Sequence, residues 1–573
     1  MKEMSDQTRG IIFVVVVIAV TFLWMRFFQP TVPPQKPATT SAVQTAPAQN
    51  ASAPAAGTSA AAAQAHPAVN AKHVVAKPAQ AQGEETIAID SSVYRVELSN
   101  RGGVVQSWKL KKYLDEEKPP RPLDLVDPDA SKELGWPFSI VLSDKQLEAE
   151  ANSALYEMTP SSASATAPVE VTFHWSNGRL DVTKKLNFTQ DYQLSVEVDV
   201  TLDGQPLPAT LAWRGGFGDR AAYRESQFVS VLYKQNGKLN TLPFKKLGAQ
   251  GRQLEPLEQA GPMEYAGIQD QFFAAVFIPD GADISLLDWQ QWHHSTANGQ
   301  AVNDPEAQMA VSAMAPGPLK VRAYVGPKDL AILGKVHPSL EELVSFGWFG
   351  VIAKPLLFVL EWMHKYVPNY GWTIVIFTLL LTMALLPIRI WTFHSARRMQ
   401  MVAPEVKSIQ DKYKKYSMSD PRKRKMNEEV MAVYQREGIN PLGSCLPMLV
   451  QLPVLWAFYR VLNGAIALRH APWIWWIHDL SAKDPYYVLP VLMVITSYFM
   501  TKMTPTPTAA ADPTQQKMMM LMPVFMGFIF LNLSSGLNLY YFSSNLIGVV
   551  QQWYLNRSQP LPSRSKFKTK KKE

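Results

Sequence analysis

The hydrophobic and polar positions of this chain follow different patterns in different parts of it. An apolar run at 11–28 follows two basic residues, and no small-residue cleavage site comes after it. A run of this length spans a bilayer, so we predict that residues 1–28 are an uncleaved signal anchor with the N-terminus in the cytosol. Residues 29–83 are mostly Ala, Pro, Gln, Thr and Ser. Such a segment buries too little apolar surface to fold and is predicted to be a disordered tether.

Residues 84–328 consist of short runs in which apolar and polar residues alternate, as in half-buried strands. Two of these runs flank Asn177 and Gly178, a dipeptide that strongly favours a hairpin turn. Further strands are expected at 94–98, 193–202, 272–278 and 320–325. No long helical period separates these runs, so the segment is predicted to be an all-β sandwich larger than an immunoglobulin domain.

The pattern becomes helical from residue 337 onward. Residues 337–366 carry apolar positions at helical spacing with charges between them, and Pro355 interrupts them. We predict an amphipathic helix in the outer membrane interface. The alternative, a poorly formed spanning segment, is disfavoured by the charges and the proline.

Five apolar runs long enough to be membrane spans follow this segment. They lie at 372–390, 446–467, 486–500, 518–533 and 537–553, the last four within 446–553. Together with the anchor they make six spans, so the tail 554–573 returns to the cytosol. The cytosolic connections then collect the basic residues, as the positive-inside rule requires.

The loop at 395–440 is rich in Lys and Arg, and its two halves have helical period on either side of a Ser-Met-Ser-Asp-Pro break. This pattern predicts a basic helical hairpin in the cytosol. Its charge is either only a solvated face or a surface that attracts lipid head groups, ribosomal RNA or an acidic chain. The basic residues of the hairpin and tail to which we assign such contacts are Arg397, Arg398, Arg422, Lys423, Arg424, Lys425, Lys570, Lys571 and Lys572.

Composition adds limits to this picture. The net charge is +8, and Cys445 is the one cysteine, which excludes an intrachain disulfide framework. The histidines of the β segment, at 174, 293 and 294, have no second cluster at metal-ligand spacing. Gly215, Gly216 and Gly218 lack the surroundings of a phosphate loop and are predicted to form a turn or bulge. The residues therefore support neither a catalytic site nor a metal or cofactor.

Arg460 lies within one of the apolar runs. A permanent charge at that depth costs about 2.5 to 3.5 kcal/mol or more unless it meets water or polar groups. Its presence predicts a wet or polar cavity within the membrane.

Three segments carry a resemblance to a known family. In order along the chain they are NPLGSCLPMLVQLP at 440–453, WIHDLSAKDPYYVLP at 476–490 and SGLNLYYFSSN at 535–545. With the anchor, the tethered β domain, the basic hairpin and the lysine-rich tail, the chain resembles the bacterial YidC membrane-protein insertases over nearly its whole length.

The resemblance implies an inner-membrane protein of Gram-negative type. It implies a periplasmic β supersandwich and a five-helix core with a hydrophilic groove. The groove would receive the polar end of a nascent membrane protein and let its apolar segment pass into lipid. The resemblance also implies a chaperone role, work alone or with the Sec translocon, and contacts with ribosomes and membrane lipids.

The family's groove arginine is missing here, because Thr382 occupies its position. Arg460, on the next span, is predicted to supply the charge from the facing helix. Outward snorkelling or helix pairing remains the alternative for this side chain. The predicted groove residues are Arg460, Thr378, Thr382, Gln451, Ser535, Asn538 and Tyr541.

Two other classes of function compete with an insertase. A polytopic transporter or channel also places an arginine within the membrane, but the chain has no paired internal repeats and no acidic residue within the spans. A periplasmic carbohydrate-binding protein or enzyme that is merely anchored by its helices does not explain the polar residues inside those helices.

Overall fold

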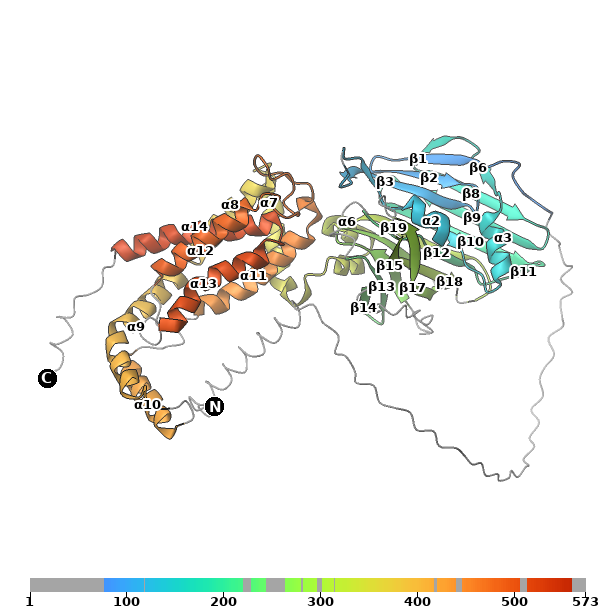
Figure 1. Cartoon of the computed structure of the whole chain (residues 1–573). Helices are drawn as coiled ribbons and strands as arrows, with labels where there is room; N and C mark the ends of the chain where they lie inside the picture. The colour runs from blue at the N-terminus through green and yellow to red at the C-terminus, as the bar shows by residue number, and fades with distance from the viewer. Residues whose placement is uncertain are drawn as a thin grey trace, which may run out of the picture. The chain divides into compact units, whose positions relative to one another are not determined.

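The computed structural model describes a β-sheet part and a helical part of the chain (Figure 1). All described residues belong to one compact unit, Lys72–Glu573. They are 77–117, 119–219, 228–243, 263–279, 282–295, 301–313, 315–416, 420–438, 446–504 and 513–558. The predicted anchor, most of the predicted tether and most of the basic tail lie outside them.

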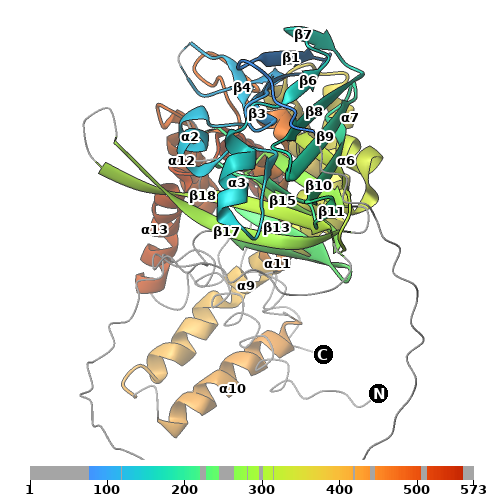
Figure 2. The ribbon, with the colours of Figure 1, turned by 90° about the vertical axis from the view of Figure 1, so that its right-hand side faces the viewer.

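The β domain contains three sheets among these residues. The largest has the order β14-β13-β15-β16-β19-β10-β9-β8-β6, with β11 paired to β10, and the others have the orders β4-β3-β2-β1-β7 and β17-β18-β12-β5. The strands of the largest sheet are β6 Glu157–Thr159, β8 Val169–Ser176, β9 Leu180–Phe188, β10 Gln193–Leu202, β11 Gln205–Pro206, β13 Ser230–Gln235, β14 Lys238–Pro243, β15 Met263–Gln269, β16 Phe273–Pro279 and β19 Leu319–Pro327. Those of the second sheet are β1 Thr86–Asp90, β2 Tyr94–Ser99, β3 Val104–Leu114, β4 Pro122–Asp124 and β7 Ser164–Thr166. Those of the third are β5 Ser139–Ile140, β12 Thr210–Trp213, β17 Ala282–Ser295 and β18 Ala301–Ala313, of which β17 and β18 form a long antiparallel pair (Figure 2).

The alternating pattern of the sequence is present as strands. β8 and β9 pair in antiparallel register from Val169–Phe188 to Ser176–Asp181, which confirms the hairpin predicted at Asn177 and Gly178. The apolar faces of the sheets meet in aromatic contacts. Trp108 of β3 packs on Phe188 of β9 at 6.2 Å between ring centroids, so the second sheet covers the largest one. The prediction of a sandwich is confirmed.

The glycine-rich stretch after β12 is a turn, as predicted. Gly216 and Gly218 have backbone φ angles of 80° and 100°, which residues with a side chain rarely adopt. A Cβ on Gly218 would also lie 2.4 Å from the Oδ2 atom of Asp270. The glycines therefore bring the backbone against buried acidic groups.

Lys184 of β9 is fully buried between the sheets. Its ammonium group donates to the carbonyl oxygens of Gly102, Gly103 and Phe138 at 2.7, 3.1 and 2.9 Å. Burial lowers the pKa of Lys184 to about 7. The three carbonyls satisfy its donors, which is why the group is tolerated in the core.

Short helices border the β domain, and longer ones make up the helical part (Figure 1). The short ones are α2 Pro128–Leu134, α3 Lys145–Ser153 and α6 Leu330–Val336, followed by the 3₁₀ turns η1 Pro338–Leu343 and η2 Gly347–Phe349. The longer ones are α7 Gly350–His364, α8 Tyr370–Ala384, α9 Leu386–Lys412, α10 Pro421–Arg436, α11 Leu446–Gly464, α12 Val488–Met503, α13 Pro513–Phe530 and α14 Ser535–Ser558.

Two of these helices differ from the predicted pattern. The amphipathic helix expected over 337–366 begins only at Gly350, and Pro355 lies within α7 instead of interrupting it. This proline removes one backbone hydrogen bond near the start of the helix, a smaller loss than in its middle. The single span expected at 372–390 is broken between α8 and α9 by a bend of 55°. Pro387 stands in the first turn of α9, where its missing N–H costs least.

Among the described residues, no helix alone combines the length and hydropathy of a membrane span, whereas the bent pair α8 and α9 passes that test together. The six predicted spans and the five-helix membrane core therefore remain predictions. The helical character of the C-terminal region is confirmed.

Helices α9 and α10 lie side by side (Figures 1 and 2). They share a small apolar core made of Met399, Val402, Val406 and Val433. Ion pairs flank this core, with Arg436 to Glu405 at 2.8 Å and Lys412 to Glu429 at 3.2 Å. The second part of α9 and α10 thus form a separate packing unit.

Candidate functional site

The polar side chains of α14 recur on one face of the helix. Asn538, Tyr541, Asn545, Gln552 and Asn556 follow one another at spacings of three or four residues, apart from a gap that Gly548 fills. Such spacing places them on one side of an α-helix. We call this set the α14 polar stripe. A polar face on a helix of an apolar bundle requires polar partners or water.

The stripe faces α12 along much of its length. Asn545 donates to the hydroxyl of Ser497 at 2.6 Å, and Asn556 donates to the carbonyl of Met503 at 3.1 Å. At the other end of the stripe, Asn538 donates to the carbonyls of Phe530 and Ser534 at 3.1 and 3.2 Å. These bonds give hydrogen-bond donors to carbonyls at the end of α13 and in the turn after it. Within the described residues the Oδ1 atom of Asn538 is buried without a hydrogen-bond partner.

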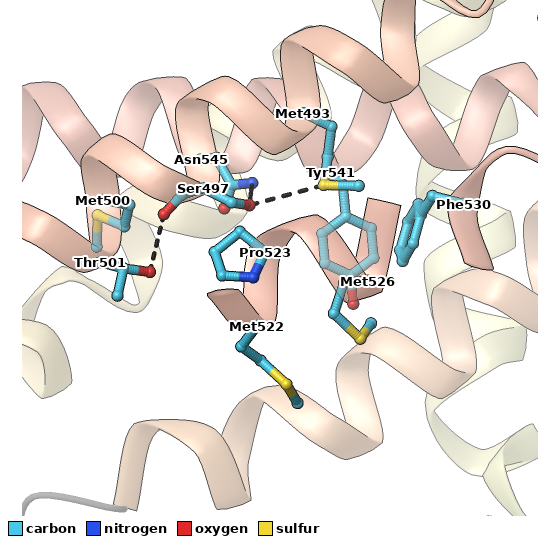
Figure 3. Close-up of a pocket in the computed structure, with 10 residues that line it drawn as sticks. All are labelled: Met493, Ser497, Met500, Thr501, Met522, Pro523, Met526, Phe530, Tyr541 and Asn545. Carbon is cyan, nitrogen blue, oxygen red and sulfur yellow. Dashed lines mark hydrogen bonds between the residues drawn. The ribbon is translucent and has the colours of Figure 1, made fainter. Parts of the chain in front are cut away.

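A cavity of about 310 Å³ opens beside the stripe, between α12, α13 and α14 (Figure 3). Tyr541 and Asn545 supply the α14 side of it. The other lining residues are Met493, Ser497, Met500 and Thr501 of α12 and Met522, Pro523, Met526 and Phe530 of α13. Methionine side chains are flexible and polarizable, so such a wall adapts to apolar groups of different shape. The cavity therefore joins an adaptable apolar wall to a polar one.

Arg389, in the first turn of α9, reaches into the bundle from the side of α14 that adjoins the stripe. Its Nη1 atom donates to the Oε1 atom of Gln551 at 3.0 Å. A Cβ on Gly548 would lie 2.7 Å from the same Nη1 atom, so the missing side chain at Gly548 makes room for the guanidinium. The Nε2 atom of Gln551 is buried without a partner among the described residues. The structure thus places a permanent positive charge next to the α14 polar stripe.

Two of the predicted groove residues lie on α8, which packs against α14. Thr378 and Thr382 are buried. Their hydroxyls donate to backbone carbonyls of their own helix, Thr378 to Ile374 at 2.7 Å and Thr382 to Thr378 at 2.8 Å. Both hydroxyls therefore have helical partners, as threonines in apolar helices usually do.

Two more of the predicted groove residues lie at the start of α14. Ser535 and Asn538 are buried, and the hydroxyl oxygen of Ser535 has no hydrogen-bond partner among the described residues. Ser535, Asn538 and Tyr541 all lie on α14, where Tyr541 lines the cavity beside α12 and α13.

The structure does not bring Arg460 to this group. Phe458 of α11 points into the bundle, where it stacks on Tyr540 at 4.3 Å and on Phe377 at 5.3 Å between ring centroids. Arg460 follows Phe458 by about 200° of helical rotation and is exposed. Its neighbour one turn earlier, Trp456, stacks on Phe349 of η2. Arg460 therefore faces away from the site, because it lies on the side of α11 opposite Phe458. The side chain of Gln451 lies outside the described part of the chain.

The basic residues predicted to make cytosolic contacts differ in their surroundings. Arg397 is partly buried and donates to Asn556 of α14 at 3.2 Å. Arg422 donates to the Asp420 carboxylate at 3.0 Å, and this contact lowers the pKa of Asp420. Within the part of the chain that the structure describes, Arg398, Lys423, Arg424 and Lys425 make no such contact, and Lys423 is partly buried whereas the others are exposed. Lys570, Lys571 and Lys572 lie outside the described residues.

One group of side chains in the described residues has the donor types of a metal site. Ligand atoms of Glu116, His470 and Asp479 lie within 4.8 Å of one another. All three side chains are partly or fully exposed, and His470 and Glu116 are already within ion-pair distance at 3.4 Å. His174, considered from the sequence, makes a hydrogen bond of 3.0 Å with Asp181, and the side chains at 293 and 294 are outside the described set.

Sequence reasoning missed Arg389. It lies at the end of the apolar run predicted as a span, where an arginine is expected to mark the cytosolic boundary. The signal that was available is Gly548, a glycine in the middle of a helix with polar residues on both sides, because such a glycine often marks a close approach of another group.

The comparisons with known proteins agree with this arrangement of parts. A family model described as "60Kd inner membrane protein" matches residues 362–562, and one described as "YidC periplasmic domain" matches residues 86–359. Together they cover the helical part and the β domain.

Individual relatives cover most of the chain as well. A membrane protein insertase YidC from Geobacter metallireducens is 33% identical over 506 residues, which are 85% of this chain and 88% of the relative. One from Bordetella avium is 31% identical over 505 residues, 84% of each chain. A crystal structure described as an active YidC insertase is 17% identical and covers 84% of this chain and 95% of its own, with a TM-score of 0.34.

The two family models that match the helical region and the β domain are described as an inner membrane protein and a periplasmic domain. The chain belongs to the YidC family.

Proposed function

We propose that this chain is a membrane protein insertase, which passes the polar end of a nascent membrane protein into the bilayer and releases its apolar segment into lipid. The observation that carries the proposal is the α14 polar stripe, with Arg389 at one side and the methionine-lined cavity at the other. Family membership supports it, because the relatives are named membrane protein insertases. No covalent chemistry is required.

The physical basis is the cost of moving polar groups into hydrocarbon. A peptide-like polar group that enters an apolar medium without a hydrogen bond loses roughly 2 to 7 kcal/mol. Among the described residues, the buried Oδ1 atom of Asn538 and the Nε2 atom of Gln551 have no hydrogen-bond partner. These polar groups of α14 offer hydrogen bonds to a substrate's polar flank or to water beside it. The barrier for that flank falls. Burial of the apolar segment in lipid then drives the reaction.

Arg389 and the methionine-lined cavity suit different parts of a substrate. A guanidinium at Arg389 attracts carboxylates, because charge-assisted hydrogen bonds are strong where water is scarce. The methionines of α12 and α13 fit apolar side chains of many shapes. We propose that Thr378, Thr382, Ser535, Asn538 and Tyr541 line this groove together with Arg389.

We also propose the topology that such a reaction needs. The segment 1–28 and the helices α8 and α11 to α14 cross the inner membrane, α7 lies in its outer interface, and both termini are cytosolic. The β domain, 84–328, is periplasmic, which agrees with the name of the family model that it matches. The α9–α10 hairpin and the tail 554–573 are then in the cytosol, where their charge suits ribosomes and anionic lipids. The Sec translocon is a further partner that we propose for longer substrates.

The test is insertion into vesicles that contain only this chain. Proteoliposomes with the purified full-length chain should protect a short single-span reporter from external protease, and empty liposomes should not. Insertion that requires an added protein, or an ion flux without insertion, would contradict the proposal. The second outcome would favour a transporter or channel, the competing class considered from the sequence.

A further inference from the structure

A buried ion pair joins the β domain to the loop between α11 and α12. Arg469 follows α11, and its Nη2 atom lies 2.7 Å from the Oδ2 atom of Asp219 in the turn after β12. The two side chains are 1% and 2% exposed. The Nη1 atom of Arg469 donates to the Leu114 carbonyl at 2.6 Å, and the guanidinium lies 5.4 Å from the ring centroid of Phe273. Arg469 is thus enclosed by three segments of the β domain.

Two further contacts join the same surfaces. Gln271, in the turn before β16, donates from its side-chain amide to the Asn463 carbonyl at the end of α11, at 2.7 Å. His470 lies 3.4 Å from the Glu116 carboxylate. Contacts on both sides of Arg469 show that the whole end of α11 and the first residues of the loop meet the β domain.

The loop that contains Arg469 has a defined fold of its own. Its backbone closes on itself through hydrogen bonds from Leu480 to Ala471 at 3.0 Å and from Trp473 to Ile477 at 2.9 Å. Leu468, Ile477 and Leu480 are buried. Packed and hydrogen-bonded residues therefore connect Arg469 to Leu480.

The far side of this loop holds the beginning of α14. The N–H groups of Ser535 and Gly536 donate to the carbonyls of Ala482 and Leu480 at 2.6 and 2.8 Å. A Cβ on Gly536 would lie 3.0 Å from the Leu480 oxygen, so the glycine permits this approach. The first N–H groups of a helix have no partner within the helix. The loop supplies these partners and thereby fixes where α14 starts.

We propose that the β domain carries a docking surface for the α11–α12 loop, with Asp219 and Arg469 as its latch, and that docking sets the position of the N-terminal end of α14. The polar stripe begins three residues into that helix, at Asn538. The significance of this position for insertion rests on the proposed function, whereas the docking itself does not.

The energetics suit a positioning role. A buried ion pair adds little net stability, because desolvation of both charges offsets their attraction. Removal of one partner is costly, because the other charge stays buried without compensation. The pair therefore selects one arrangement of the two surfaces, in which each charge meets the other.

Hydrogen exchange of the full-length chain in detergent, without substrate, tests the latch. Asp219→Asn should speed exchange of the Ser535 and Gly536 amides at least tenfold, while the amides that pair β9 with β10 stay protected. The control is Asp203→Asn. Asp203 pairs with Arg179 through two hydrogen bonds of 3.1 Å, but these side chains are 50% and 70% exposed, so exchange at α14 should not change.

A second variant removes both charges. Asp219→Leu combined with Arg469→Met removes both charges of the latch together, so it should restore part of the protection that Asp219→Asn loses. Unchanged exchange at Ser535 and Gly536 in Asp219→Asn would overturn the proposal. So would general unfolding in Asp219→Asn that the double variant fails to relieve. Failure of the vesicle insertion assay with intact latch protection would contradict the proposed function alone.

Discussion

Single side chains decide where charge lies in the helical region. Arg389 reaches Gln551 and the space left by Gly548, whereas Arg460 is exposed on the side of α11 opposite Phe458. Two arginines in neighbouring apolar runs therefore have different surroundings. Lys184 shows in the same way that the β domain accommodates a lysine amino group in its core by surrounding it with carbonyl oxygens.

Arg389 and Arg460 should differ in their effect on insertion. Arg389→Ala should lower insertion of a reporter with an acidic flank about tenfold, because a hydrogen bond to a charged group contributes roughly 1.5 to 3 kcal/mol. A reporter with a neutral flank should be less affected. Arg460→Ala is the matched control and should change insertion less than twofold. Protease protection of the reporter in vesicles with equal amounts of each variant measures insertion. An equal loss of insertion in Arg389→Ala and Arg460→Ala would refute the assignment of Arg389 to the groove.

Lys184 should make the stability of the β domain depend on pH. Its pKa is about 7 in the folded protein and 10.5 in the reference state. Between these values the unfolded chain holds the proton and the folded chain does not, so stability rises with pH from 7 to 10.5 and is lowest below 7. Lys184→Met should flatten this slope. Lys185→Met, at an exposed neighbouring position, should leave it unchanged. Denaturant unfolding at several pH values measures the free energy of unfolding of each variant. Equal pH dependence in Lys184→Met and Lys185→Met would disprove the role of Lys184.

Elements of the helical region separate into two packing units. α8, α11, α12, α13 and α14 enclose the polar stripe and the cavity, whereas the second part of α9 packs with α10 around its own apolar core. The bend of 55° between α8 and α9 allows this separation. Because the hairpin has its own core, its surface charge is free to change without loss of its fold.

The hairpin's charge should govern ribosome binding. Changing Lys423, Arg424 and Lys425 to Gln should weaken binding and reduce its salt dependence, since contacts to phosphates release counterions. Arg422 is left intact because it pairs with Asp420, whose side chain caps α10. The control removes the same charge from exposed lysines of the β domain, Lys112, Lys185 and Lys320. Cosedimentation with ribosomes over a salt series compares the two triple variants. Equal binding and equal salt dependence in both would contradict a role of the hairpin in ribosome binding.

At the scale of the whole molecule, the proposed insertion site and the β domain come from separate lengths of chain. The stripe, the cavity and Arg389 all lie between α8 and the end of α14. The β domain meets the helical region through the Arg469 contacts, and the proposed latch gives it a positioning role.

Deletion of most of the β domain, with the anchor and α7 retained, should release the start of α14 from the docking surface but leave insertion largely intact, because the stripe, the cavity and Arg389 all remain. Arg469 would then be exposed to water, so no buried charge would lose its partner. Complementation of a depletion strain by the truncated chain is the measurement. Loss of function at normal protein levels would show that the periplasmic part is needed for the reaction itself.

The sequence by itself determined the kind and order of the elements, because alternation and helical period are local properties of the chain. The hairpin at Asn177 and Gly178 is an example. It also contained the family motifs and the spacing of the α14 polar stripe. Only the tertiary structure decided which charges meet. The rotation of α11 turns Arg460 away from Thr382, the bend after α8 brings Arg389 to Gly548, and folding joins Asp219 to Arg469 across 250 residues of chain. Helix rotation, bend angle and long-range contact depend on packing, which no local pattern encodes.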